Sequence, residues 1–157
     1  MNLRTPRSMA APLVVFVGFG ANASAVCLDP GDPTGTSYHY PSLEEEATGS
    51  AAIVVVRVVR TEPLGDNSSD PEGWSAFNYT LQVIQVFKGE VSRSFGLRVE
   101  NDSGGYRMWD GETHLLFLAN GGVGLRVDPC GNSTEMPQGA GIVKRLRAIL
   151  QSQQHVG

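Results

Sequence analysis

Two cysteines, Cys27 and Cys130, enclose nearly all of the strand-forming sequence of this chain. They are its only cysteines, and the segment between them has the alternating and β-branched runs of one β-rich domain. In an exported chain two cysteines most simply pair with each other. A metal site is the alternative, but the cysteines and the scattered His39, His114 and His155 show no ligand spacing. The sequence therefore predicts one disulfide, no metal and no cofactor.

The first 25 residues are typical of a secretory signal peptide. Arg4 and Arg7 form a basic start, an apolar run covers residues 10–19, and Ala23-Ser24-Ala25 fits the cleavage pattern of signal peptidase. The apolar run is shorter than the roughly 20 residues that a membrane-spanning helix needs. We expect cleavage after Ala25, a mature chain that begins at Val26, and a periplasmic or extracellular location.

Charge and length limit the function classes. The 157 residues include 12 basic and 16 acidic side chains, and loss of Arg4 and Arg7 with the signal peptide leaves a net charge of −6. A surface of this sign does not attract nucleic acid. We expect a signal peptide at residues 1–25, one domain at 26–135, and a C-terminal helix and tail at 136–157, with no membrane span in the mature chain.

Five strands are predicted. The first covers Ala51–Thr61 and is mostly buried at its start, the second covers Ala76–Lys88, and the others lie near residues 95–99, 112–119 and 123–128. In the second strand the apolar alternation slips by one residue, because Ile84 and Val86 continue the apolar set. Such a slip predicts a β-bulge.

The fold class that follows is all-β with short helices, as a five-stranded OB-fold barrel that is closed or nearly closed, followed by a C-terminal amphipathic helix. An immunoglobulin-like sandwich is the alternative. It needs about seven strands, and its disulfide does not join the two ends of the chain.

Two helices flank the strands. Ser42 and Glu45 fit a capping box, and the acidic residues Glu44, Glu45 and Glu46 suit a solvated helix start. Near the C-terminus, apolar residues follow helical spacing and predict a helix that packs on the β domain: Ile142, Val143, Leu146, Ile149 and Leu150. The nearby cations are interpreted as a solvated helix face: Lys144, Arg145 and Arg147.

Several segments occur in the order found in bacterial domains like the tissue inhibitors of metalloproteinases (TIMPs) and the netrin-like (NTR) domains. They are Cys27, the run Ser42-Leu43-Glu44-Glu45-Glu46-Ala47, the run from Tyr79 to Val86-Phe87-Lys88-Gly89, the run Gly111–Phe117, and Cys130. Over about residues 27–131 the chain resembles this family. The resemblance implies an OB-fold barrel and supports a Cys27–Cys130 disulfide.

The chain departs from the family at the inhibitory N-terminus. Family inhibitors begin with Cys-x-Cys and chelate the protease zinc through the first cysteine, but here that position is Ala25. The usual disulfide partner of that cysteine is also missing, at Gly104-Gly105. We therefore expect no zinc chelation by the N-terminus. His114 replaces a family tyrosine, and we interpret it as a half-buried strand residue.

No nucleophile–base signature, phosphate loop or paired-carboxylate motif is present. We therefore expect a non-catalytic, monomeric module that binds a protein partner through its N-terminal segment, the loop at residues 62–73 and the loop at 104–110. Candidate contact residues are Val26, Trp74, Tyr106 and Trp109. The alternatives are a TIMP-like metalloprotease inhibitor, or an enzyme or a small-ligand or glycan binder whose site gathers Trp74, Tyr106, Trp109 and His114.

Overall fold

The computed structural model describes residues 27, 31, 33–34, 38–65, 73–102, 104–122 and 124–154. The predicted signal peptide, the cleavage site and Val26 lie outside these residues, as do residues 66–72 of the loop predicted at 62–73. None of the described helices has the length and apolar character to cross a membrane.

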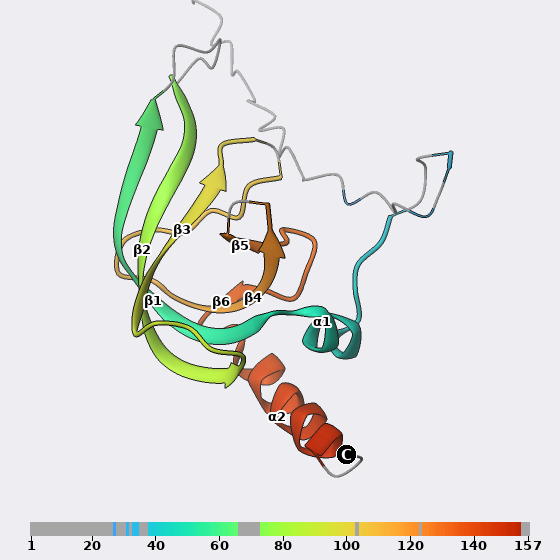
Figure 1. Ribbon diagram of the computed structural model, residues 1–157. Coiled ribbons are helices and arrows are strands. Elements are labelled where there is room, and N and C mark those ends of the chain that lie inside the picture. The colour runs from blue at the N-terminus through green and yellow to red at the C-terminus, as the bar shows by residue number, and fades with distance from the viewer. Residues whose placement is uncertain are drawn as a thin grey trace, which may run out of the picture.

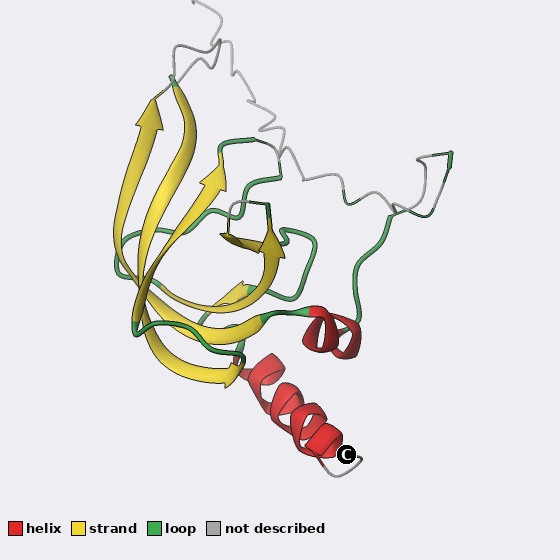
Figure 2. Cartoon of the chain, viewed as in Figure 1, coloured by secondary structure: helices red, strands yellow, loops and turns green. Residues whose placement is uncertain are grey.

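The described strands form a single six-stranded antiparallel sheet, with two helices beside it (Figures 1 and 2). The elements in chain order are α1 Leu43–Gly49, β1 Ala52–Gly65, β2 Trp74–Lys88, β3 Ser94–Glu100, β4 Thr113–Gly121, β5 Gly124–Val127, β6 Thr134–Glu135 and α2 Ala140–Gln154. The β-rich class and five of the strands agree with the prediction. The sixth strand, β6, was not predicted, because a strand of two residues is too short to show an alternation of apolar and polar side chains.

The sheet has two ends. Its strand order is β3-β2-β1-β4-β5, with β6 pairing to β4. Within the described residues no ladder joins β3 to β5, so the ring of hydrogen bonds that a barrel requires is not complete. The strands therefore form a twisted antiparallel sheet that is open between β3 and β5 (Figure 1).

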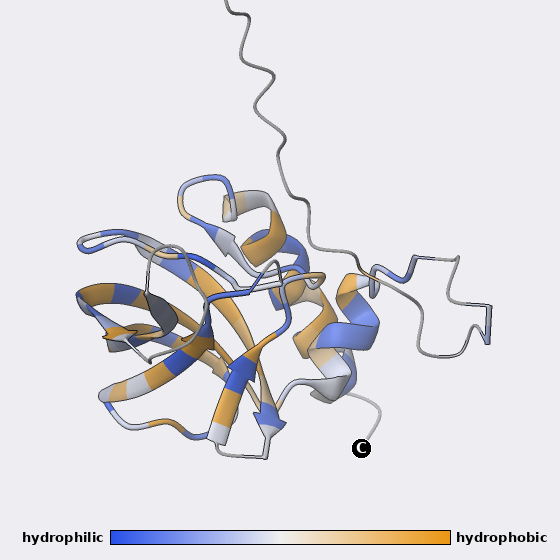
Figure 3. Ribbon diagram, turned by 90° about the horizontal axis from the view of Figure 1, so that it is seen from above, coloured by the Kyte–Doolittle hydropathy of each residue, from blue (hydrophilic) through white to orange (hydrophobic). Residues whose placement is uncertain are grey.

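The start of β1 is buried on both faces, as predicted. Val54, Val56 and Val58 belong to a core on one face that β2, β3 and β4 share, while Ile53 and Val55 belong to a second core on the other face. Both helices contribute to this second core, and Leu146 of α2 is fully buried in it. Hydrophobic and hydrophilic residues alternate along the strands accordingly (Figure 3). The C-terminal helix packs its apolar side on the sheet, as expected.

The predicted β-bulge in β2 is present. Val55 pairs with Gln85 and Val56 pairs with Val83, so Ile84 is an extra residue with no partner. Ile84 and Val86 continue the apolar alternation of β2 but are not buried, because their side chains are 58% and 46% exposed. Beyond Val83, β2 has no further pairing with β3 and is the edge strand of the sheet.

The run Phe87-Lys88-Gly89 at the end of β2 has a structural role. The Lys88 ammonium donates hydrogen bonds to the carbonyls of Ala47 (2.8 Å) and Thr48 (2.7 Å), at the C-terminal end of α1. A cation suits this end of a helix. Phe87 packs against the second core, the one to which both helices contribute. Gly89 follows with a left-handed φ of 76°. The run therefore joins the sheet to α1.

The disulfide joins the two ends of the domain. Cys27 and Cys130 are bonded, with 5.6 Å between their Cα atoms and 103 positions between them in the sequence. Cys27 is buried, and its carbonyl accepts a hydrogen bond from the His39 amide. The N-terminal segment is thereby held beside the chain that leaves β5.

The capping box of α1 is also present, since Ser42 and Glu45 exchange their hydrogen bonds (2.8 and 3.2 Å). The interpretation of the whole acidic run as solvated is wrong at Glu46, whose carboxylate turns toward the segment after Cys130. One of its oxygens accepts hydrogen bonds from the amide and side chain of Asn132, and the other is buried with no partner among the described residues. Gly131 allows this approach, because a Cβ there would lie 2.0 Å from Glu46 Oε1.

Burial raises the pKa of Glu46, and the hydrogen bonds from Asn132 oppose that shift only in part. The folded protein therefore binds this proton more tightly than the unfolded chain. The stabilisation is present below the ordinary pKa of 4.5 and is lost as the pH rises through the raised folded-state value. We expect Glu46→Gln to remove this loss, so that the variant gains stability relative to the native protein as the pH rises above 4.5.

Urea unfolding at several pH values between 4.5 and 7 measures this difference. The control is Glu44→Gln, which makes the same charge change on the exposed side of α1. Stability curves of the native protein and Glu46→Gln that stay parallel over this range would contradict the assignment.

Candidate functional site

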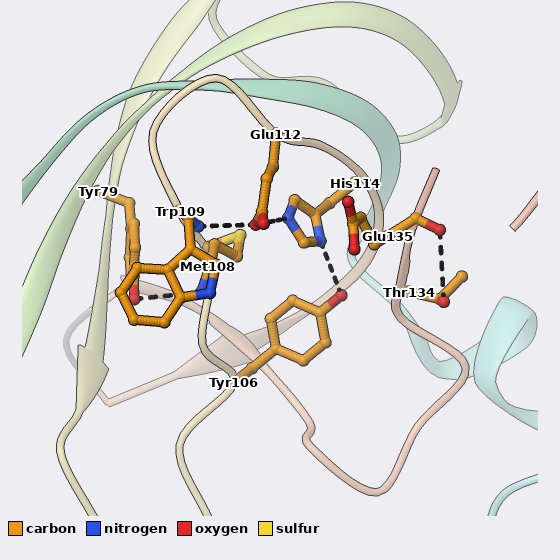
Figure 4. A network of polar contacts seen from close by, with 8 residues as sticks. All are labelled: Tyr79, Tyr106, Met108, Trp109, Glu112, His114, Thr134 and Glu135. Carbon is orange, nitrogen blue, oxygen red and sulfur yellow. Dashed lines mark hydrogen bonds and ion pairs between the residues drawn. The ribbon is translucent and has the colours of Figure 1, made fainter. Parts of the chain in front are cut away.

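The segment from Gly104 to Glu112 joins β3 to β4 and displays Trp109. We call it the Trp109 loop. The Trp109 side chain is 65% exposed, although the neighbouring Met108 is buried. Figure 4 shows Trp109 at the turn of this loop, with a polar network behind it.

The backbone of the Trp109 loop is held by hydrogen bonds to Glu112, to the buried Tyr79 and to β1. The Trp109 amide donates to Glu112 Oε2 (2.7 Å), and the Met108 amide donates to the buried Tyr79 hydroxyl (3.4 Å). Gly111, with a left-handed φ of 89°, donates its amide to the Val58 carbonyl (2.9 Å), and the Val58 amide donates to the Glu112 carbonyl (2.9 Å). These bonds extend the β1–β4 ladder into the loop.

His114 lies at the centre of the network (Figure 4). Its Nε2 is 3.0 Å from Glu112 Oε2 and its Nδ1 is 3.0 Å from the Tyr106 hydroxyl. Because a carboxylate only accepts, Nε2 donates to Glu112, and in the neutral tautomer that this requires Nδ1 accepts from the Tyr106 hydroxyl. His114 is a strand residue, as expected, but it is 3% exposed, so the expectation of half-burial is wrong. The residues that cover it come from the loop and from β6, where Glu135 pairs with it.

Tyr106, His114 and Glu112 stand in the order of a nucleophile, a base and an orienting carboxylate. The Tyr106 hydroxyl, however, points into the protein. Burial raises the pKa of Tyr106 well above its ordinary value, and the carboxylates of Glu112 and Glu135 add to the shift. The hydroxyl therefore stays protonated and serves as a hydrogen-bond donor. The geometry suits support of the loop rather than nucleophilic attack.

Trp74, at the start of β2, is 41% exposed and packs edge-on against Phe77, with 5.8 Å between the ring centroids. The Arg107 guanidinium of the Trp109 loop lies 4.5 Å from the Phe77 ring centroid. Arg107 also hydrogen-bonds Asn101, whose side chain donates to the Trp74 carbonyl (2.7 Å). Trp74 and the Trp109 loop are thus connected through these residues.

Of the four predicted contact residues, the structure places Trp74 and Trp109 on the surface and Tyr106 partly inside, while Val26 lies outside the described residues. Sequence reasoning missed Glu112 and Tyr79 as supports of the loop. One signal for Glu112 was available, because residues two apart in a strand share a face and Glu112 precedes His114 by two.

A groove of about 990 Å³ lies elsewhere, along the facing ends of the sheet. Its lining comes from β1 to β5 and from the start of the Trp109 loop. It includes the glycines Gly96, Gly104, Gly105, Gly121, Gly122 and Gly124. Neither tryptophan lines it. The two tryptophans are therefore separate from this groove, although Gly104, Gly105 and Tyr106 of the Trp109 loop contribute to its lining.

In the part of the chain that the structure describes, no group of three or more His, Cys, Asp or Glu side chains could hold a metal ion. A comparison with models of known protein families and a comparison with curated proteins both give no match.

Proposed function

We propose that this chain is an exported, non-catalytic module with an OB-type fold, which binds a protein partner through the Trp109 loop. The observation that carries the proposal is a tryptophan that is 65% exposed on a loop whose backbone amides are hydrogen-bonded to the Glu112 carboxylate and to the buried Tyr79 hydroxyl.

The strand order supports the OB-type assignment. In an OB fold the first strand pairs with the second and the fourth, and the third and fifth lie next to each other. Here β1 pairs with both β2 and β4, and β3 and β5 are the two outer strands that would pair with each other in a closed barrel. The disulfide between the N-terminal segment and the chain after β5 fits the resemblance to TIMP-like and netrin-like domains. Export is supported by the same disulfide and by the signal-like residues 1–25.

A fixed loop suits binding because association costs the freedom of every group that becomes ordered. Tryptophan is enriched among residues that dominate the energy of interfaces. An exposed indole on a backbone that is already ordered provides a large contact area at low ordering cost. Trp74, joined to the same loop through Phe77 and Arg107, extends the contact surface.

Two features favour binding over the alternatives. The Tyr106 hydroxyl is held as an inward donor, which leaves the loop without an activated nucleophile. The family mechanism of zinc-protease inhibition needs a first cysteine that this sequence lacks. We therefore propose neither hydrolysis nor zinc chelation.

The test replaces Trp109 by alanine. A partner is captured from the exported fraction with the immobilised mature protein, identified, and titrated by calorimetry. We expect Trp109→Ala to weaken binding by about 2 kcal/mol or more, roughly a 30-fold loss of affinity. The matched control is Tyr40→Ala, since Tyr40 is 67% exposed but lies outside the loop, and we expect a change under about 0.5 kcal/mol.

Equal affinity of the Trp109→Ala and native proteins for the partner would contradict the proposal. So would turnover of a substrate that is lost in both Tyr106→Phe and His114→Gln while the fold is retained.

A further inference from the structure

The solvent-facing side of α2 displays three basic residues. Lys144, Arg145 and Arg147 are exposed, while Leu146 between them is fully buried in the second core. Within the described residues none of the three cations forms an ion pair. Arg147 lies 5.7 Å from the centroid of the Phe87 ring, a contact that leaves its charge at the surface. The helix therefore displays three positive charges that no described carboxylate pairs with.

The charge of α2 is opposite in sign to that of the rest of the chain. No acidic residue follows Glu135 in the sequence. Without Arg4 and Arg7, the chain keeps ten of its 12 basic residues and all 16 acidic ones, so seven basic residues outside α2 stand against 16 acidic residues. Figure 1 shows α2 extending beyond the sheet, at the opposite end of the domain from the end of β1 and the start of β2. The helix is thus a positive region at one end of an acidic protein.

Aliphatic side chains border the cations on the helix. Four of them pack against the second core and remain only partly buried: Ile142, Val143, Ile149 and Leu150. Residues four apart on a helix are neighbours, so Arg147 lies next to Val143. By the same spacing Arg145 lies next to Ile149. Long basic side chains at such a boundary cover apolar surface with their stems and hold their charges in a polar layer.

The shape of this side of α2 selects among anionic partners. The groove is lined by β1 to β5 and the Trp109 loop, and no residue of α2 contributes to it. Small uncharged residues occupy other exposed positions of the helix: Ala140, Gly141, Ala148 and Ser152. The helix has no aromatic ring on which a nucleic-acid base could stack. A planar anionic surface needs neither a pocket nor a ring, and cations beside aliphatics suit the boundary between headgroups and acyl chains.

Only charges close to such a surface affect binding strongly. At about 0.1 M salt the Debye length is about 10 Å, so acidic residues on the far side of the sheet repel the surface only weakly. Each Lys or Arg near anionic lipid strengthens binding roughly fivefold. Three cations together give a gain on the order of 100-fold, which is typical of weak and reversible docking.

We propose that α2 docks the protein on an anionic phospholipid surface, with Lys144, Arg145 and Arg147 among the headgroups. The site uses no residue of the Trp109 loop, so it goes beyond the function proposed above. Because the start of β2 is at the opposite end of the domain, docking leaves Trp74 directed away from the lipid.

The experiment is co-sedimentation of the mature protein with two kinds of vesicle, one of equal parts phosphatidylglycerol and phosphatidylcholine and one of phosphatidylcholine alone. We expect binding to the anionic vesicles only, and its loss at about 1 M salt, where the Debye length is about 3 Å. The test variant is Lys144→Gln/Arg145→Gln, which leaves the Arg147 contact with Phe87 intact. We expect it to bind the anionic vesicles roughly 25-fold more weakly.

The matched control is Arg93→Gln/Arg126→Gln, which makes the same change in net charge at exposed residues outside α2. We expect this control to change vesicle binding by less than about twofold. Trp109→Ala is a second control, because an exposed tryptophan can itself enter the headgroup region. Vesicle binding of Trp109→Ala is expected to equal that of the native protein.

The proposal stands only if the anionic vesicles bind and the α2 pair alone weakens that binding. Absence of binding to the anionic vesicles, equal binding to both kinds of vesicle, or an equal loss in the Arg93 and Arg126 control overturns it. Loss in Trp109→Ala places the lipid contact on the Trp109 loop and also overturns it. Displacement from the vesicles by single-stranded DNA or polyglutamate at an equal concentration of negative charge assigns α2 to that polyanion instead. None of these outcomes alters the test of the Trp109 loop with its protein partner.

Discussion

Replacement of Cys27 and Cys130 by serine is expected to lower the free energy of unfolding by about 2–5 kcal/mol. The bond closes a loop of 103 positions, and restricting so long a loop in the unfolded chain is worth about 4–5 kcal/mol in the chain-entropy model. A domain of this size has a net stability of about 5–15 kcal/mol. The loss is therefore a large fraction of the total.

The measurement is urea unfolding of the native protein, each single variant and the double variant, with mass spectrometry to establish the bond. Reduction of the native protein is the matched control, because it removes the crosslink without changing the sequence. Native-like stability in the double variant would show that the packing of β1 and the helices holds the ends of the domain without the bond.

The second large effect is expected at Gly89. Its φ of 76° is in the left-handed region, and a Cβ there would lie 2.2 Å from the Ala51 carbonyl oxygen and 2.9 Å from the Ala52 Cα. The left-handed conformation costs a non-glycine residue about 1–2 kcal/mol, and forced repacking adds about 1–3 kcal/mol. We expect Gly89→Ala to destabilise the protein by roughly 2–5 kcal/mol.

Gly49→Ala provides the control, since a Cβ at Gly49 meets nothing within 4 Å and its φ is not left-handed. We expect a change within about 0.5 kcal/mol there. If Gly89→Ala melts within a degree of the native protein, the close contact between the end of β2 and the start of β1 is wrong.

The local features of the fold could be predicted because each has a short-range cause. The capping box at Ser42 and Glu45 needs only four residues in order, and the bulge at Ile84 follows from a change of alternation within one strand. The disulfide followed from the presence of two cysteines in a chain with a signal-like start, and the family resemblance supported it. These signals do not depend on which elements meet in space.

The features that were missed depend on distant partners. Nothing near Glu46 distinguishes it from Glu44, and its burial comes from Asn132, 86 positions away. Ile84 is an exposed bulge residue in the part of β2 that has passed its pairing with β3. His114 is buried because the Trp109 loop folds back over it, so its environment could not be predicted from its place in an alternating strand.

The candidate site was predicted in part for the same reason. Trp74 and Trp109 were selected as aromatics near loops, which composition and spacing show. Tyr79 and Glu112 support the loop through hydrogen bonds to its backbone amides. Such bonds depend on the folded position of the loop and leave no pattern in the sequence.

The central claim is that Trp109 is exposed on an ordered loop, and backbone nitrogen-15 NMR relaxation tests it most directly. The network behind the loop predicts an order parameter of about 0.85 for the Trp109 amide, equal to that of the β1 strand, together with an indole N–H that exchanges rapidly with water. An order parameter below about 0.6 for the Trp109 amide, or an indole N–H protected from exchange, would contradict the account.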